Sequence, residues 1–217
     1  MTIKIQLLGH ASFKMKVSDK IIYIDPDGGD DSLYKEKANI ILSTHEHGDH
    51  SNPKKIALAR DEHTRVFTST KNCNNIKGVV TAIDPGEKQK VEGIIIHGVP
   101  GYNVRRFRSP NVPFHPREIQ TAFIIEAEGK RIYFAGDTDF IEEMKDLKNI
   151  DIAMLPIDGK YTMDPQEAMD AVGVIKPKMV IPMHWRDKDP EKFKLDVEKK
   201  YPEIKVIVIK PGEEFEI

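Results

Sequence analysis

Residues 44–50 hold the densest group of potential metal ligands in the chain, in the order Thr-His-Glu-His-Gly-Asp-His. Four of them, His45, His47, Asp49 and His50, fall within six consecutive residues. Imidazole and carboxylate groups bind zinc, manganese and iron. Because the chain has only eight histidines, finding three of them so close together favours a metal site over a polar surface loop.

The apolar, β-branched run before this cluster, residues 39–43, predicts a buried strand. If the extended backbone continues, His45 and His47 point to one side, because alternate residues of a strand share a face. Gly48 lets the chain bend sharply, so that Asp49 and His50 reach a second point nearby. The cluster therefore predicts ligands around two neighbouring points.

Two further candidate ligands also follow apolar strands. Asp137 comes shortly after Ile132-Tyr133-Phe134, and His184 ends the run Ile181-Pro182-Met183. The carboxyl ends of separate buried strands can meet in one cleft at the mouth of a sheet. A carboxylate there can bridge two cations about 3.5–4 Å apart that hold a hydroxide between them. Alone, Asp137 is equally well a turn residue and His184 a core histidine, but beside the 44–50 cluster they predict a metal centre.

The remaining pattern places these residues in a layered fold. Strands are expected at 2–8, 11–17, 20–25, 38–43, 65–69, 79–82, 93–98, 121–128, 131–135, 150–155, 178–183 and 204–209. Helices are expected at 52–61, 139–147, 165–175 and 190–200; the first begins at Asn52-Pro53, and Asp164-Pro165-Gln166-Glu167 is a capping box. This order, consecutive strands followed by alternating strands and helices, predicts helices packed on the outside of layered sheets.

The composition sets bounds on the class of protein. A length of 217 residues suits one domain over 1–217, and 33 Lys+Arg against 35 Asp+Glu argue against a dedicated nucleic-acid or membrane-surface protein. The single Cys73 excludes an intrachain disulfide and a cysteine-rich zinc ribbon. No apolar run approaches the roughly 20 residues of a membrane span. With no signal-peptide pattern at the start, we expect a soluble cytoplasmic protein.

The motifs His45-x-His47-x-Asp49-His50, Gly136-Asp137-Thr138 and Pro182-Met183-His184, with a histidine between the first two, resemble the metallo-β-lactamase fold superfamily of metal-dependent hydrolases. Leu155-Pro156-Ile157-Asp158-Gly159, followed by Tyr161-Thr162-Met163, is similar to the branch that contains L-ascorbate-6-phosphate lactonase. The resemblance implies an αββα sandwich, two mixed β-sheets flanked by helices, with the metals at one edge of the sheets.

The resemblance also implies a ligand set for two divalent metal ions, zinc in the first place and manganese or iron as alternatives. His45 and His47 would bind the first ion with one further histidine. Asp49, His50 and His184 would bind the second, and Asp137 would bridge. We favour His115 over His97 as the further histidine, because Tyr102-Asn103 and Phe114-His115-Pro116 match relatives in this branch.

This centre predicts metal-activated hydrolysis in which a bridging hydroxide attacks a carbonyl or phosphorus atom. Asp49 and Asp137 are the catalytic candidates, with Asp49 holding or relaying the proton. The expected substrate is a small, anionic molecule with an ester-type bond, either a lactone or a phosphodiester. The chain has no Gly-x-Ser-x-Gly elbow, and Cys73 has no evident activating partner, so a covalent nucleophile is unsupported.

Four other functions compete with this one. A nuclease or phosphodiesterase acting on nucleic acid would need a basic excess that the chain lacks. A β-lactam substrate is disfavoured by the absence of a signal peptide. A di-iron redox enzyme is disfavoured because His47 is retained and no flavin domain follows. A non-enzymatic metal-binding regulator is disfavoured by the complete ligand set. A homo-oligomer remains open.

Several residues outside the ligand set are secondary candidates. Asp25 ends a strand and is expected to orient a ligand imidazole. His10 either faces the cleft or is a hydrogen-bonded structural histidine, and His63 is expected to be solvated. Asp158 and Lys160 are expected near the pocket. The basic segment Arg105-Arg106-Phe107-Arg108 is either a flap that attracts anions or a solvated loop.

Overall fold

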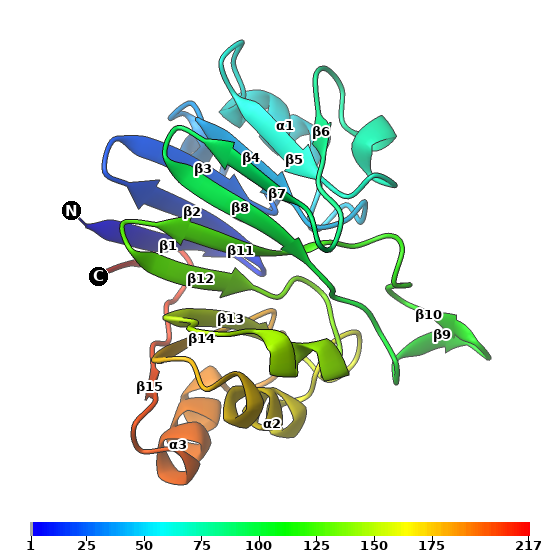
Figure 1. Cartoon of the computed structure of the whole chain (residues 1–217), viewed down its shortest axis with the longest axis vertical. Coiled ribbons are helices and arrows are strands. Elements are labelled where there is room, and N and C mark those ends of the chain that lie inside the picture. Colours follow the sequence, from blue (N-terminus) through cyan, green and yellow to red (C-terminus); the bar gives the residue numbers. More distant parts are fainter. Residues whose placement is uncertain (1) are drawn as a thin grey trace.

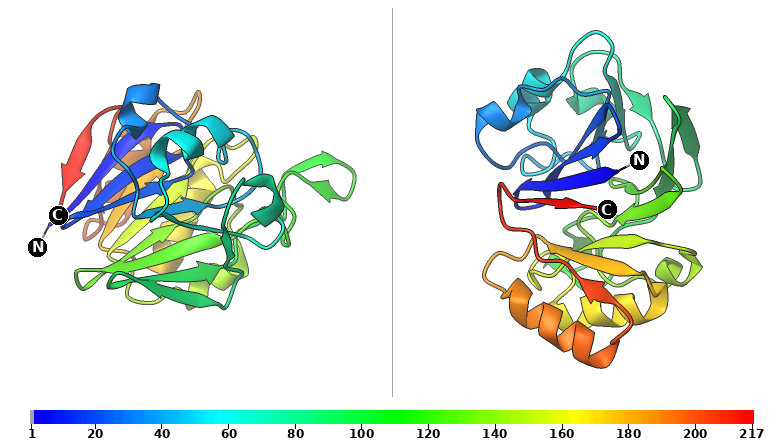
Figure 2. Two further views of the ribbon diagram at one scale, coloured as in Figure 1. Left: turned by 90° about the horizontal axis from the view of Figure 1, so that it is seen from above. Right: turned by 90° about the vertical axis from the view of Figure 1, so that its left-hand side faces the viewer.

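The computed structural model describes residues 2–217 and contains two seven-stranded β-sheets that pack face to face between helices (Figure 1). The fold expected from the sequence, a sandwich of two mixed sheets flanked by helices, is confirmed. Figure 2 shows the four layers from two further directions. Within residues 2–217, no helix is both long and apolar enough to cross a membrane.

The first sheet contains most of the N-terminal strands and takes one strand from the C-terminus. In sheet order these are β16 (Glu214–Glu216), β1 (Ile3–Gly9), β2 (Ser12–Val17), β3 (Lys20–Ile24), β4 (Ile40–Ser43), β5 (Arg65–Thr68) and β6 (Thr81–Ala82). The strands from β16 to β3 pair antiparallel, and those from β3 to β6 pair parallel. The parallel half brings the carboxyl end of β4 to the edge where β3 and β5 also end.

The second sheet is mixed in the same way. Its order is β15 (Lys205–Val206), β14 (Met179–Met183), β13 (Ile152–Pro156), β12 (Lys130–Phe134), β11 (Ala122–Ala127), β8 (Ile94–Val99) and β7 (Lys88–Val91). The strands from β12 to β15 are parallel and the others antiparallel. The turn between β11 and β12 uses Glu128 and Gly129, both at positive φ.

The α-helices are α1 (Pro53–Ala59), α2 (Pro165–Ile175) and α3 (Pro190–Lys200). Each begins with a proline and is capped by the side chain of the preceding residue, Asn52, Asp164 or Asp189, which accepts hydrogen bonds from the first turn. Helix α1 covers the outer face of the first sheet, and α2 and α3 cover that of the second (Figure 1, Figure 2).

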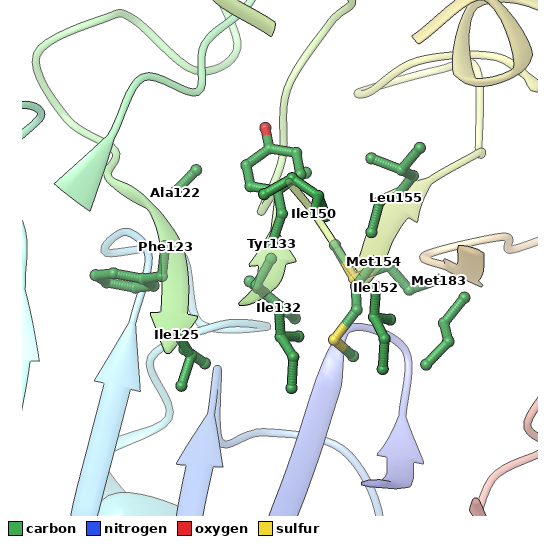
Figure 3. Packing of buried hydrophobic residues seen from close by; sticks show 14 of the residues in the cluster. Ala122, Phe123, Ile125, Ile132, Tyr133, Ile150, Ile152, Met154, Leu155 and Met183 are labelled. Atoms are coloured by element: carbon green, nitrogen blue, oxygen red, sulfur yellow. The ribbon is translucent and has the colours of Figure 1, made fainter. Parts of the chain in front are cut away.

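The apolar core fills the space between the sheets because alternate side chains of each strand point inward. Figure 3 shows Ile125, Ile132 and Ile152 pointing toward the N-terminal strands, whereas Tyr133 and Leu155 point the opposite way, toward the helical layer. Phe13 of β2 and Phe134 of β12 meet edge to face across the interface, with ring centroids 6.0 Å apart. A smaller cluster, which includes Tyr23, Ile41 and Ile56, lies under α1.

Two expected elements differ from the structure. Residues 139–147 do not form an α-helix but a single 3₁₀ helix, η3 (Glu142–Asp146), whose preceding residue Ile141 offers no side-chain cap. The expected strand 204–209 is limited to β15, because the chain then leaves that edge and crosses to the first sheet, where it forms β16 (Figure 2). Two more 3₁₀ turns are η1 (Asp31–Tyr34) and η2 (Cys73–Asn75).

The basic segment after residue 104 forms a hairpin that the sequence did not predict. Its strands are β9 (Phe107–Ser109) and β10 (Val112–Pro113), paired antiparallel. The hairpin projects from the body of the molecule, beside the edge at which β4, β12 and β14 end (Figure 1). The chain returns from it through Phe114 and His115.

Candidate metal centre

The candidate ligands gather where strands of both sheets end. The tight turn after β4, closed by hydrogen bonds of 2.9 Å from the N–H groups of His50 and Ser51 to the carbonyl of His47, carries the first cluster. Asp137 follows β12 and His184 follows β14. The side-chain amide of Gln120 donates a 2.9 Å hydrogen bond to the carbonyl of Asp137 and accepts one of 3.0 Å from its N–H. Ligand-type residues at the ends of three strands therefore converge, as the sequence predicts.

One group consists of His45, His47 and His115. The Nε2 atoms of His45 and His115 each lie 3.1 Å from Nδ1 of His47. Ligand nitrogens around a tetrahedral zinc ion, at bond lengths of 2.0–2.1 Å, are separated by about 3.4 Å. The three nitrogens are thus spaced to take one small cation.

The neighbouring group consists of His10, Asp49, His50 and His184. Its histidines approach Asp137, whose Oδ1 lies 3.3 Å from Nε2 of His50 and whose Oδ2 lies 3.2 Å from Nε2 of His184. Oδ2 of Asp137 also lies 3.4 Å from Nε2 of His115, which belongs to the first group. The Asp137 carboxylate therefore stands between the two groups.

His10, in the turn directly after β1, completes the second group. Its Nε2 lies 3.4 Å from Oδ2 of Asp49, its ring is 3.7 Å from that of His184, and its carbonyl accepts a 3.2 Å hydrogen bond from the N–H of His184. The contact with His10 is the largest of the effects that keep the pKa of Asp49 below its ordinary value. His10 therefore lies within the ligand group, with its Nε2 buried.

Four of the histidines are held through their Nδ1 atoms, which leaves Nε2 facing inward. The partners are Thr44 Oγ1 for His45 at 2.9 Å, Asp25 Oδ2 for His50 at 2.7 Å, Asn103 Oδ1 for His115 at 2.8 Å and Asp158 Oδ2 for His184 at 3.0 Å. Such partners fix the ring orientation and tautomer of metal-binding histidines. The expected role of Asp25 matches this geometry.

The buried polar atoms of the centre test whether a cation fits. Among residues 2–217, the buried Nε2 atoms of His50 and His184 and Oδ1 of Asp137 make no hydrogen bond. A buried polar atom without a partner costs about 1–3 kcal/mol, and a divalent cation would satisfy all three. The histidine and aspartate groups are therefore placed to bind metal.

The charge states of Asp137, His45 and His115 agree with this donor set, whereas His50 and His184 would have to lose a proton to bind a cation. Burial would lower the pKa of both, but Asp137 outweighs burial, so that the pKa of His184 rises to about 9 and that of His50 well above its ordinary value. Burial would raise the pKa of Asp137, but His184 and His50 outweigh burial and hold it well below the ordinary value. Burial lowers the pKa of His45 well below its ordinary value and that of His115 to about 4. An ionised carboxylate and neutral imidazoles are the forms that ligate a metal ion.

The structure separates the remaining histidines from this centre. His97 lies on β8 with its Nε2 3.0 Å from Glu126 and belongs to none of the ligand groups. His63, 86% exposed in its side chain, lies beside Glu62, as expected of a solvated residue. His115, rather than His97, thus stands with His45 and His47.

The basic segment matches the solvated interpretation only in part, because Arg105, Phe107 and Arg108 are exposed while Arg106 is not. Arg106 is largely buried and pairs with Asp139 at 3.0 Å and with Glu167 of α2. Arg105 also binds Glu167, at 2.8 Å. Both guanidinium groups therefore tie the hairpin to the body of the protein, although the Arg105 side chain remains 64% exposed.

A cavity of about 230 Å³ opens over the candidate ligands; its lining residues are His47, Asp49, Phe114, His115, Asp137, Tyr161 and Arg186. Sequence analysis did not identify Tyr161 or Arg186 as pocket residues, although Arg186 follows His184 by only two positions. A larger hollow of about 640 Å³, lined by residues such as Arg131, Lys148 and Lys178, contains none of the candidate ligands. The smaller cavity is therefore the candidate active site.

Comparisons with known proteins agree with this geometry. Residues 4–184 match the model of the β-lactamase superfamily domain. A UPF0173 metal-dependent hydrolase of Pyrococcus abyssi is 35% identical over 234 aligned positions, covering 99% of this chain and 100% of the relative. A second, of Thermococcus onnurineus, is 34% identical with the same coverage. The structure of Igni18, a metallo hydrolase of Ignicoccus hospitalis, is similar with a TM-score of 0.83 at 27% identity, covering 100% of this chain and 99% of that one.

Proposed function

The chain belongs to the β-lactamase superfamily, as a UPF0173 metal-dependent hydrolase, and we propose from this premise that it is a dinuclear enzyme that cleaves ester-type bonds in small molecules. We take the whole chain, 1–217, as one hydrolase domain. The observation that carries the proposal is the position of Asp137, whose carboxylate contacts histidines of both ligand groups at 3.2–3.4 Å.

We assign the ligands by group. His45, His47 and His115 would hold the first cation, and Asp49, His50 and His184 the second. Asp137, which contacts histidines of both groups, would contribute its carboxylate to both sites. Zinc is the first candidate because a donor set of imidazoles and carboxylates suits it, and manganese or iron are the alternatives.

When bound, two such cations supply Lewis-acid chemistry that lowers the pKa of water from about 16 to about 7 and stabilises negative charge developing on the substrate. The protein orients the reactants. Asp49 lies on the cavity wall, and because His10 keeps its pKa low, its ionised carboxylate accepts a hydrogen bond from the attacking water. The walls formed by Phe114 and Tyr161 limit access of bulk water to the scissile bond.

The dimensions of the cavity support a small substrate. Its volume of about 230 Å³ is below the range of roughly 300–1,000 Å³ typical of sites for drug-sized ligands. A lactone or a small phosphodiester is of suitable size. Both kinds of substrate contain a carbonyl or phosphoryl oxygen that a bound cation would polarise.

Metal analysis and a matched pair of variants test the proposal. We expect elemental mass spectrometry to find about two zinc ions per chain and the loaded protein to hydrolyse lactones or aryl phosphodiesters. Asp137→Asn should lower kcat/KM by at least about 100-fold, since it weakens the bridge between the ions. Asp146→Asn, an exposed carboxylate on η3, is the control. A single ion per chain, or full activity in Asp137→Asn, would overturn the dinuclear mechanism.

A further inference from the structure

We propose that Arg186 binds an anionic group of the substrate, so that the preferred substrates are esters that carry a carboxylate or phosphate away from the scissile bond. The inference rests on the proposed function and adds the substrate class. It assigns substrate recognition to a side chain that lines the cavity and is not one of the proposed metal ligands.

Local backbone geometry directs Arg186 into the cavity. His184 and Arg186 both have positive φ, 49° and 48°, so the chain turns tightly after β14. Nε of Arg186 lies 3.3 Å from Oδ2 of Asp158, and this oxygen is 3.0 Å from Nδ1 of His184. One buried carboxylate thus sets the distance between the guanidinium group and a proposed metal ligand.

The outer face of the guanidinium remains available. Its NH2 is 3.9 Å from Oδ2 of Asp49, beyond the 2.7–3.2 Å of an N–H···O hydrogen bond. In the part of the chain that the structure describes, the terminal nitrogens of Arg186 donate no hydrogen bond to a protein atom, and the side chain is 42% exposed. A planar fork of free donors suits a carboxylate or phosphate in bidentate geometry.

Two aromatic rings shape the rest of the subsite. Phe114 and Tyr161 meet edge to face at 4.9 Å, and the guanidinium carbon of Arg186 lies 4.8 Å from the centroid of Tyr161. The cation–π contact holds the guanidinium plane near the ring. A short apolar linker against Phe114 would therefore place an anion on Arg186 while the ester lies over the metal ligands.

The other cations near the opening are less suited to this role. Arg105 and Arg106 are neutralised by Glu167, and Arg108 donates a 2.9 Å hydrogen bond to the carbonyl of Phe114. Lys160 lies 4.9 Å from the centroid of Tyr161 but does not line the cavity. Among the described residues that line it, Arg186 is the one lysine or arginine.

A pair of esters with one leaving group tests the inference on the metal-loaded protein. Mono-4-nitrophenyl glutarate carries a distal carboxylate, and 4-nitrophenyl pentanoate is its neutral counterpart of similar length. We expect a lower KM for the glutarate ester. Because a hydrogen bond to a charged group contributes 1.5–3 kcal/mol, Arg186→Gln should raise that KM by about 10- to 100-fold and leave the KM of the pentanoate within about twofold. Arg186→Lys should retain part of the preference, and Lys160→Gln all of it.

Titration calorimetry with free glutarate supplies a readout that does not depend on turnover. The zinc-loaded wild type should bind glutarate, and Arg186→Gln should lose that binding while it keeps its metal content. If neither ester is hydrolysed but glutarate binding depends on Arg186, the subsite stands and the hydrolytic function falls. If both esters are hydrolysed with the same KM in wild type and Arg186→Gln, the subsite is wrong and the function stands. Loss of metal from Arg186→Gln would make the arginine a support for Asp158 and overturn the inference.

Discussion

The carboxylate of Asp25 lies 2.7 Å from Nδ1 of His50, and both side chains are fully buried. The same carboxylate accepts hydrogen bonds from the N–H and the hydroxyl of Thr44, at 2.7 and 2.8 Å. Because the Thr44 hydroxyl donates to Asp25, its oxygen accepts from Nδ1 of His45, 2.9 Å away. Asp25 thus orients one histidine from each of the two proposed metal sites.

Asp25→Asn should therefore lower the affinity of the protein for each of the two metal ions by about 10- to 100-fold. Asn103→Ala, which removes the partner of His115 alone, should weaken only the first. Competition with a chromophoric zinc chelator measures both affinities, and far-UV circular dichroism checks that each variant is folded. An Asp25→Asn protein that loses only one ion would contradict the linkage through Thr44.

Metal removal should lower the thermal stability of the whole chain, because the cations satisfy buried atoms contributed by both sheets. At a free metal concentration 100 times the Kd, binding contributes about 2.7 kcal/mol, and for a protein of this size each kcal/mol shifts Tm by roughly 2–4 °C. We expect scanning calorimetry to record a fall in Tm of about 5–10 °C for each cation that chelation removes, and recovery on adding zinc. A Tm that does not respond to metal would argue that the groups bind no cation in the folded protein.

The anchor of the hairpin predicts how stability depends on pH. Burial would raise the pKa of Glu167, but its ion pair with Arg106 outweighs burial and lowers it below 4.5. The ion pair therefore stabilises the fold above pH 4.5, and this contribution is lost as the pH falls through the pKa of the folded state.

Glu167→Gln should cost about 1–3 kcal/mol at pH 7, and the difference from wild type should shrink toward pH 3. Urea denaturation across this range measures it, and the exposed Glu142→Gln of η3 is the control. A difference that stays constant from pH 7 to pH 3 would show that the loss comes from the cap of α2, which Glu167 also forms, and not from the ion pair.

The contact between Phe13 and Phe134 joins the two sheets, so truncation of Phe13 should leave a cavity in the middle of the sandwich. We expect Phe13→Ala to cost about 3–5 kcal/mol and Phe13→Leu clearly less. Phe107 of the hairpin, 44% exposed, is the matched control, and Phe107→Ala should change the free energy of unfolding by no more than about 0.5 kcal/mol. Chemical denaturation of the three variants measures the difference, and equal costs for Phe13→Ala and Phe107→Ala would contradict this packing.

The sequence by itself determined the strands that end at the site and most of the ligand types. The cluster at 44–50, Asp137 after β12 and His184 after β14 are local patterns, since an apolar strand followed by a polar turn is set by neighbouring residues. The caps of α1 and α2 are local in the same sense. The α-helix expected at 139–147 was wrong: Ile141 offers no side-chain cap, and the segment forms only the short 3₁₀ helix η3.

Only the tertiary structure decided which side chains meet across long separations. His115 lies 68 positions from His47. The motif Phe114-His115-Pro116 favoured it over His97 by resemblance alone, whereas its contact with His47 depends on packing, as the place of His97 on β8 depends on how β8 pairs with β11. Glu167 of α2 forms ion pairs with both Arg105 and Arg106. The turn after His184 and the buried Asp158 bring Arg186 to the cavity. Charge and residue type can be read from the chain, but whether a charge is paired, buried or free depends on the packing of elements distant in sequence.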